Sequence, residues 1–196
     1  MPLRQRAGAL VLAAACACVH AADKEPQCGA VTADPALAVQ ACTRLIEFGS
    51  LERPDLAKAY YTRGTEWANQ GNADRAIPDF NLAIELDPKL AAAYYNRALA
   101  WSAKGDADRA VADYGAAMKL SPTDPNPWLG RAAEWIAKAD YKRATADYED
   151  ALRLDSRSWQ AYFGRGRARF YGGEFMLAAS DFYRAHQLEP GIYPAL

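Results

Sequence analysis

Apolar and small side chains recur along this chain at spacings of three, four and seven residues, which place them on one side of an α-helix. Three stretches carry two aromatic residues seven positions apart: Tyr60 and Trp67, Tyr94 and Trp101, and Trp128 and Trp135. After each comes a second stretch in which two alanines stand seven positions apart with an aromatic ring between them. The pattern therefore predicts pairs of amphipathic helices.

The helix pairs repeat with a period of 34 residues, and four units follow one another without a gap: 57–90, 91–124, 125–158 and 159–192. The alanines of the second helix recur in all four units, as Ala76 and Ala83, Ala110 and Ala117, Ala144 and Ala151, and Ala178 and Ala185. The aromatic residues between them are Phe80, Tyr114, Tyr148 and Phe182. The fourth unit departs from the others in its first helix, because Arg169 stands where they have tryptophan.

Turn residues recur with the same period. Where the first helix of each unit must stop, the chain has Gly71, Gly105, Ala139 and Gly173. Just beyond the end of the second helix it has Pro88, Pro122, Ser156 and Pro190. Each unit is thus expected to be a helix, a short turn and a second helix.

This order of aromatic, small, aromatic, alanine, aromatic, alanine and proline positions resembles the tetratricopeptide-repeat family, at that family's own spacing. The resemblance covers the four units of 34 residues, or 136 of 196 residues. It implies an all-α fold, a right-handed solenoid in which each helix pair completes its core by stacking on its neighbours. One departure recurs, since arginine stands where the family often has leucine: Arg63, Arg97, Arg131 and Arg165.

These arginines recur in step with one aspartate in each unit: Asp79, Asp113, Asp147 and Asp181. We expect a ladder of ion pairs between the two helices of each unit. An anion-binding site is the alternative. Evenly spread and neutralised pairs, however, lack the concentrated positive field that an anion site needs.

Residues 23–56 are interpreted as a degenerate N-terminal capping repeat. Asp34 resembles an N-cap followed by proline in the first turn, and Gly49 resembles a helix end, with a linker around residues 50–54. The spacing of Ala76, Phe80 and Ala83 is copied by Ala38, Cys42 and Leu45. A cysteine therefore stands where the other units have an aromatic ring.

The first 22 residues have the layout of a secretory signal peptide: two arginines, an apolar run over 7–19, and small residues at Ala21 and Ala22. We expect this segment to be removed and the mature chain to be periplasmic or secreted. The apolar run is shorter than the roughly 20 residues that a membrane-spanning helix needs. A lipoprotein is less expected, because Ala13 and Ala15 replace the leucine that usually stands three places before a lipidated cysteine.

Cys28 and Cys42 are the cysteines that remain in the mature chain, and in an oxidising compartment we predict that they form a disulfide. Two unpaired buried thiols are the alternative. A bridge would replace aromatic packing in the N-terminal repeat with a covalent link. It would thereby cap the open end of the solenoid.

Charge and residue types narrow the function. The formal net charge is −1, and about −3 without the first 22 residues, which gives no field that would attract nucleic acid. The mature chain has one histidine, His186, no zinc-ligand spacing and no phosphate-binding glycine loop. We therefore expect no enzymatic activity, no metal and no cofactor.

In the family that this chain resembles, the first helices of successive units line a concave groove. The resemblance places these residues there: Lys58, Tyr61, Thr65, Tyr95, Asn96, Leu99, Asn126, Leu129, Ile136, Phe163, Arg167 and Tyr171. This aromatic and apolar surface suits an extended or helical peptide, whose backbone Asn96 and Asn126 could bind. An idle groove, in which the rings only pack on one another, is the alternative.

Some family members grip a C-terminal carboxylate in this groove with lysines, arginines and asparagines. Only Asn96 matches that set in place, because the positions expected to be basic hold Tyr61, Asn126 and Gly130. A clamp for a chaperone tail is therefore not expected.

The expected function is that of a scaffold or adaptor that binds a peptide segment of a partner protein in the groove. The alternative is a structural component of envelope assembly that is lipid-anchored or self-associating. The 193–196 tail leaves no room for a polar capping helix, so we expect open apolar surface at the C-terminal end. Self-association could occur there, unless His186 and Glu189 make the last helix polar enough.

Overall fold

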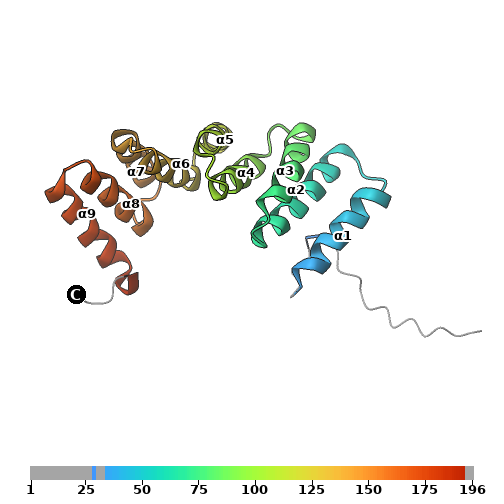
Figure 1. The fold of residues 1–196 in the computed structure, drawn as a ribbon, viewed down its shortest axis with the longest axis horizontal. Coiled ribbons are helices and arrows are strands. Elements are labelled where there is room, and N and C mark those ends of the chain that lie inside the picture. Colours follow the sequence, from blue (N-terminus) through green and yellow to red (C-terminus); the bar gives the residue numbers. More distant parts are fainter. Residues whose placement is uncertain (1–27, 30–33, 193–196) are drawn as a thin grey trace, which may run out of the picture.

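The computed structural model describes residues 28, 29 and 34–192, and over these residues the chain is helical and has no strand (Figure 1). The α-helices are α1 Pro35–Phe48, α2 Arg53–Asn69, α3 Ala73–Leu86, α4 Ala91–Ala103, α5 Ala107–Leu120, α6 Asn126–Ala137, α7 Tyr141–Leu154, α8 Trp159–Tyr171 and α9 Phe175–Leu188. A short 3-10 helix, Pro190–Ile192, follows α9. The all-α solenoid predicted from the sequence is confirmed.

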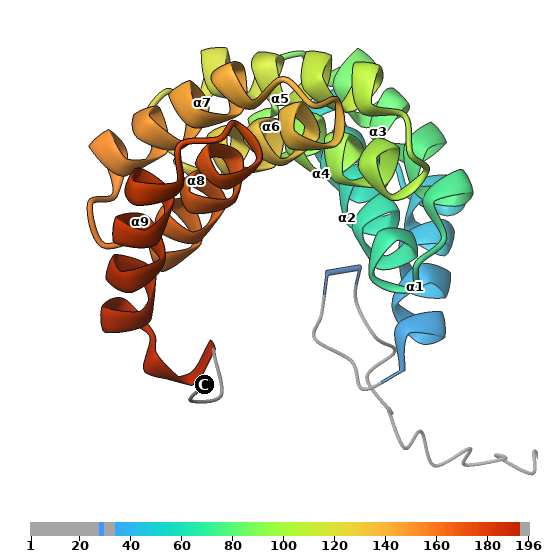
Figure 2. The same ribbon diagram turned by 60° about the vertical axis from the view of Figure 1, so that its left-hand side comes forward.

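The helices stack in pairs along an arc. Each first helix packs on the second helix of its own pair, and that second helix packs on the first helix of the next pair. Consecutive first helices α2, α4, α6 and α8 also contact one another, whereas α3, α5, α7 and α9 do not. The first helices therefore line the inner side of the arc and the second helices its outer side (Figure 2).

The turns between paired helices share one backbone conformation. Gly71, Gly105 and Gly173 have positive φ angles of 72°, 76° and 84°, in the left-handed region that glycine adopts without penalty. Ala139 adopts φ 57° at the same place in the third unit, so the turn is kept where the chain lacks glycine. The next helix is then capped by the side chain of Asn72, Asp106 or Asp140 in the first three units.

Small residues and rings form the core, as the repeat predicts. Ala76, Ala83, Ala110 and Ala117 are at most 1% exposed, and Phe80 is fully buried. Tyr114 and Tyr148 are buried against glycines of the next inner helix. A Cβ atom would lie 2.4 Å from the Tyr114 ring at Gly130 and 2.2 Å from the Tyr148 ring at Gly164. This fit between units was not predicted from the sequence.

The expected ladder of ion pairs is confirmed in all four units. Each arginine donates from Nε and Nη2 to the two carboxylate oxygens of its aspartate, at 2.6–3.0 Å. The aspartates are only 3–7% exposed. Hydrogen bonding to Asp79 raises the pKa of Arg63, although burial of the guanidinium opposes the shift. The pairs hold the two helices of a unit together as bidentate, charge-assisted hydrogen bonds.

Arg169, which replaces tryptophan in the fourth unit, joins this ladder. Its Nη1 donates to Asp181 at 2.7 Å and its Nη2 to Glu149 of α7 at 3.1 Å. In the first three units a second-helix arginine lies over the tryptophan ring at 3.8–4.6 Å: Arg75, Arg109 and Arg143. Leu177 stands at that position in the fourth unit, so both partners of the cation–π contact are replaced together.

The N-terminal helix begins and ends where the sequence predicts, with Asp34 accepting a hydrogen bond from the Ala36 N–H and Gly49 at the C-cap. The predicted linker over 50–54 is too long, because α2 already begins at Arg53. The Arg53 side chain donates to the carbonyl oxygens of Leu86 at 3.1 Å and Glu85 at 2.9 Å. It thereby ties the start of α2 to the open C-terminus of α3.

Helix α1 packs on α2 as each later outer helix packs on the next inner helix. Ala38 and Cys42 are buried, whereas Leu45 is 38% exposed. The sulfur atoms of Cys28 and Cys42 lie 2.13 Å apart. The expected signal peptide over 1–22 and the tail over 193–196 lie outside the described residues.

Candidate protein-binding site on the inner surface

The structure places the twelve predicted groove residues on the four inner helices, three on each. Lys58, Leu99, Asn126, Arg167 and Tyr171 are exposed, and the other seven are half-buried. Five of the side chains are therefore open to solvent, whereas the other seven are partly covered by neighbouring residues.

Several predicted groove residues also pack the repeats together. Tyr61, Tyr95 and Phe163 pair with rings of the outer helices, at centroid distances of 6.2, 5.9 and 5.7 Å. Leu129 and Ile136 pack on a buried cluster that spans α6, α7 and α8. The structure therefore gives these five side chains a packing role whether or not the groove holds a partner.

The amide groups of the groove are used inside the chain. Asn96 donates from Nδ2 to the Tyr61 hydroxyl at 3.3 Å and to Thr65 Oγ1 at 3.2 Å. Asn126 donates from Nδ2 to the Asp124 carboxylate at 2.8 Å. The Asn96 NH₂ group thus has a partner within the chain for each of its two hydrogens, and these would have to be exchanged before it could bond a partner's backbone. Its carbonyl oxygen remains as an acceptor.

Three predicted residues meet at one cavity of about 230 Å³ between α2, α3 and α4. Thr65, Asn96 and Leu99 line it together with Asn69 at the end of α2, Gly71 in the following turn, and the small residues Ala68, Ala73, Ala100 and Ala103. Leu99 is 44% exposed at its edge. A mostly apolar cavity with three polar side chains on its wall can receive one apolar side chain of a partner.

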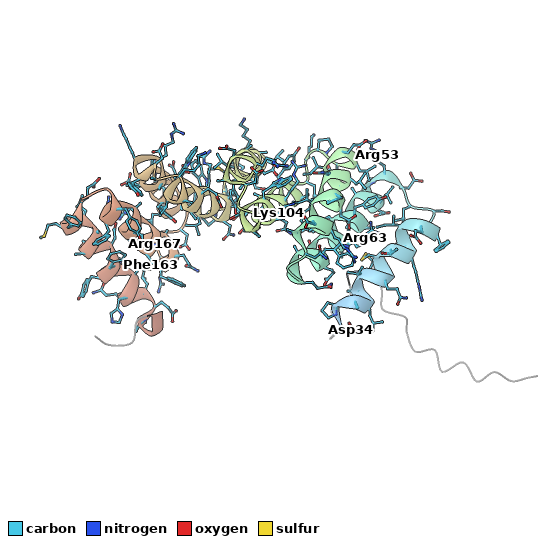
Figure 3. All side chains as sticks on the ribbon, viewed as in Figure 1. Asp34, Arg53, Arg63, Lys104, Phe163 and Arg167 are labelled. Carbon is cyan, nitrogen blue, oxygen red and sulfur yellow. A yellow bond between two sulfur atoms is a disulfide. The ribbon has the colours of Figure 1, made fainter. Side chains whose placement is uncertain are left out.

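Two basic side chains, Lys58 on α2 and Arg167 on α8, are exposed on the inner helices. Within the described part of the chain, neither has a carboxylate at ion-pair distance. The Arg167 guanidinium lies 6.0 Å from the Phe163 ring centroid, and the two side chains lie side by side on α8 (Figure 3). Burial, and then the Asp124 carboxylate, raises the pKa of the Tyr95 hydroxyl.

Tyr171 belongs to a different cluster from the other predicted residues. It stacks on Tyr141 at 5.7 Å and contacts Phe170 at 5.8 Å, and Phe170 in turn contacts Phe175 at 5.5 Å. Beside these rings lies a second hollow of about 880 Å³, between α7 and the end of α8, which none of the twelve residues lines. Sequence reasoning missed it, although Tyr141 stands where the first two units have Ala73 and Ala107.

Neither a membrane span nor a metal centre is found in the described residues. None of their helices combines the length and the apolar character needed to cross a bilayer. No group of three or more His, Cys, Asp or Glu side chains among them could hold a metal ion.

Comparison with solved structures identifies similar folds. A structure of MamA is 19% identical, covers 80% of this chain and 90% of its own, and superposes with a TM-score of 0.74. The TPR domain of Arabidopsis OM64 is 24% identical, with 61% and 98% covered and a TM-score of 0.59. YrrB, described as a TPR protein with an unusual peptide-binding site, is 15% identical, with 81% and 79% covered and a TM-score of 0.69.

Comparison with models of protein families shows to which family the chain belongs. No curated protein matches the sequence at a significant level. Three models described as tetratricopeptide repeat match residues 57–90, 91–124 and 129–195. These ranges contain the helix pairs, the ion-pair ladder and most of the inner surface described above. The chain belongs to the tetratricopeptide-repeat family.

Proposed function

We propose that this protein is a non-enzymatic scaffold that holds a peptide segment of a partner protein against the inner surface of the arc. The family and its fold support a role in protein–protein interaction. The cavity bordered by Thr65, Asn96 and Leu99 is the observation that carries the proposal, because it offers a mostly apolar hole with polar edges between the neighbouring inner helices α2 and α4 and the start of α3. The peptide-binding description of YrrB is consistent with the same use of this fold.

Leu99 is the residue with which to test the groove. It is exposed, whereas Tyr95 packs on Tyr114 and would disturb the core if it were removed. The test uses peptides selected for binding to the purified wild-type chain. Their affinity for the Leu99→Lys variant is expected to be at least about tenfold lower, because the lysine would place a charge in an apolar contact. Titration calorimetry with the selected peptides measures this loss.

Ala112→Lys is the matched control, because Ala112 is exposed on the outer helix α5. Its affinity for the same peptides is expected to equal that of the wild type. Peptides that bind both variants as tightly as the unchanged chain would show that the inner surface is not their site.

The proposal includes export and a disulfide between Cys28 and Cys42. A signal peptide over 1–22 would deliver the chain to the periplasm or the medium, where disulfides persist. The pairing of Cys28 with Cys42 in the structure and the burial of Cys42 support a structural bridge at the N-terminal end. Intact-mass measurement of the exported protein tests the cleavage and would detect an added lipid.

Reduction of this bridge is expected to lower the free energy of unfolding. The two cysteines are 14 residues apart in sequence, and in the chain-entropy model closing such a loop stabilises the fold by about 3 kcal/mol. Urea titrations of the mature chain with and without reductant measure the difference. The double variant Cys28→Ser, Cys42→Ala should be indifferent to reductant, and a wild-type chain equally indifferent would contradict the bridge.

A further inference from the structure

The outer side of α9 differs from that of the other outer helices in its first turn. At two adjacent positions there, the earlier units carry charged pairs: Asp74 and Arg75, Asp108 and Arg109, Lys142 and Arg143. In α9 these positions hold Met176 and Leu177, which are 86% and 49% exposed. Seven residues after Met176, Tyr183 is 66% exposed. Helix α9 lies at one end of the arc (Figure 1), so these exposed side chains form an apolar stripe there.

This stripe continues the interface that joins one unit to the next. At the Met176 position, Asp74 pairs with Lys104 and Asp108 pairs with Lys138 of the following inner helix. At the Tyr183 position, Asn81 accepts from Arg97 at 2.7 Å and Glu149 accepts from Arg169 at 3.1 Å. In α9 the side chains at both positions, Met176 and Tyr183, are exposed.

A further helix of the same type as the inner helices would not suit this face. Those helices place lysine and arginine opposite Asp74, Asp108, Asn81 and Glu149. Against Met176 and Tyr183 such cations would lose their polar partners and their water. The occupant must instead be an apolar helix surface with small residues near its centre.

The same stripe of a second copy meets this description. Ala179 and Ser180 lie midway between Met176 and Tyr183, so two antiparallel α9 helices related by a two-fold axis would place small residues at the axis. Each Met176 would then lie opposite the Tyr183 ring of the other copy, a favourable sulfur–aromatic contact. The stripe residues themselves carry no charge, and the neighbouring Asp181 is already buried in the ion-pair ladder.

We propose that the protein forms a two-fold homodimer in which the Met176–Tyr183 stripe of α9 packs on the same stripe of a second copy. The interface is isologous, so it closes at two copies and does not grow into a fibre. It lies on the outer helix α9 and is separate from the inner surface, so this inference does not depend on peptide binding.

Light scattering of the purified mature chain over a range of concentrations tests the dimer. The wild type is expected to show twice the chain mass. Tyr183→Asp and Met176→Asp, both at exposed positions, are expected to weaken dimerisation at least about tenfold because each buries a charge without a partner. Ala112→Asp on α5 is the control, and it should dimerise as the wild type does.

Cysteine cross-linking is an independent test of the proposed dimer interface. Ser180→Cys should form a covalent dimer under mild oxidation, because the two copies of residue 180 lie beside the axis, whereas Ala112→Cys should not. The proposal is wrong if the wild type remains a monomer up to about 1 mM. Equal cross-linking of the two cysteine variants, or a monomer whose α9 face instead binds a different protein, would also overturn it.

Discussion

Replacement of Asp181 with alanine is expected to lower the free energy of unfolding by about 3–5 kcal/mol. The Asp181 side chain is 4% exposed and accepts hydrogen bonds from both Arg165 and Arg169. Without it, two guanidinium groups that are 17% and 13% exposed would face each other, and among the described residues Glu149 of α7 is the one carboxylate left at ion-pair distance. Urea unfolding followed by circular dichroism measures the loss, and hydrogen exchange should locate it in α8 and α9.

Asp150→Ala is the matched control for this prediction. Asp150 pairs with Arg153 one helical turn away, and that arginine side chain is 73% exposed. Ion pairs in contact with water contribute about 0–1 kcal/mol, so the control should lose little stability. Similar losses in the two variants would mean that burial does not govern the ladder.

Gly164→Ala is expected to destabilise the protein by about 1–3 kcal/mol, although alanine is the better helix former. The added Cβ would lie 2.2 Å from the ring of Tyr148 on α7. That ring is only 5% exposed, so it has little room to move aside. The backbone of α8 must therefore move away from α7. Thermal unfolding of the variant measures the effect.

At another helical glycine, Gly115, replacement with alanine should increase the stability of the protein. A Cβ atom at Gly115 of α5 would meet only Arg131 Nη1, at an ordinary contact distance of 3.8 Å. Gly115→Ala should therefore stabilise the chain by up to about 1 kcal/mol through helix propensity alone. If both alanine variants were stabilised, the close fit of Tyr148 against Gly164 would be refuted.

The parts of the fold that repeat could be predicted from the sequence. Positions such as Ala76 and Phe80 recur with one period, and the pairing of Arg63 with Asp79 follows because both residues recur in step. The turn at Ala139 was also predicted, since the turns in the other units fix its position. Recurrence therefore identified the elements, their order and the bonds within each unit.

Contacts that reach beyond one 34-residue unit could not be predicted in this way. The fit of Tyr148 to Gly164 joins two helices of different units, and no single unit displays it. Recurrence also does not show that the Arg53 side chain, at the start of α2, bonds carbonyl groups at the end of α3. In the groove, sequence placed Asn96 on the inner surface, but only the structure shows that Tyr61 and Thr65 occupy its NH₂ group.

The apolar stripe of α9 also limits how the array could lengthen by gene duplication. A copy of residues 125–158 placed after the last unit would bring its Lys138 against Met176, where the original lysine meets Asp108. Its Arg131 would meet the Tyr183 ring, where Gly115 otherwise leaves room. A fifth full unit could be accepted at this end only if α9 changed at the same time.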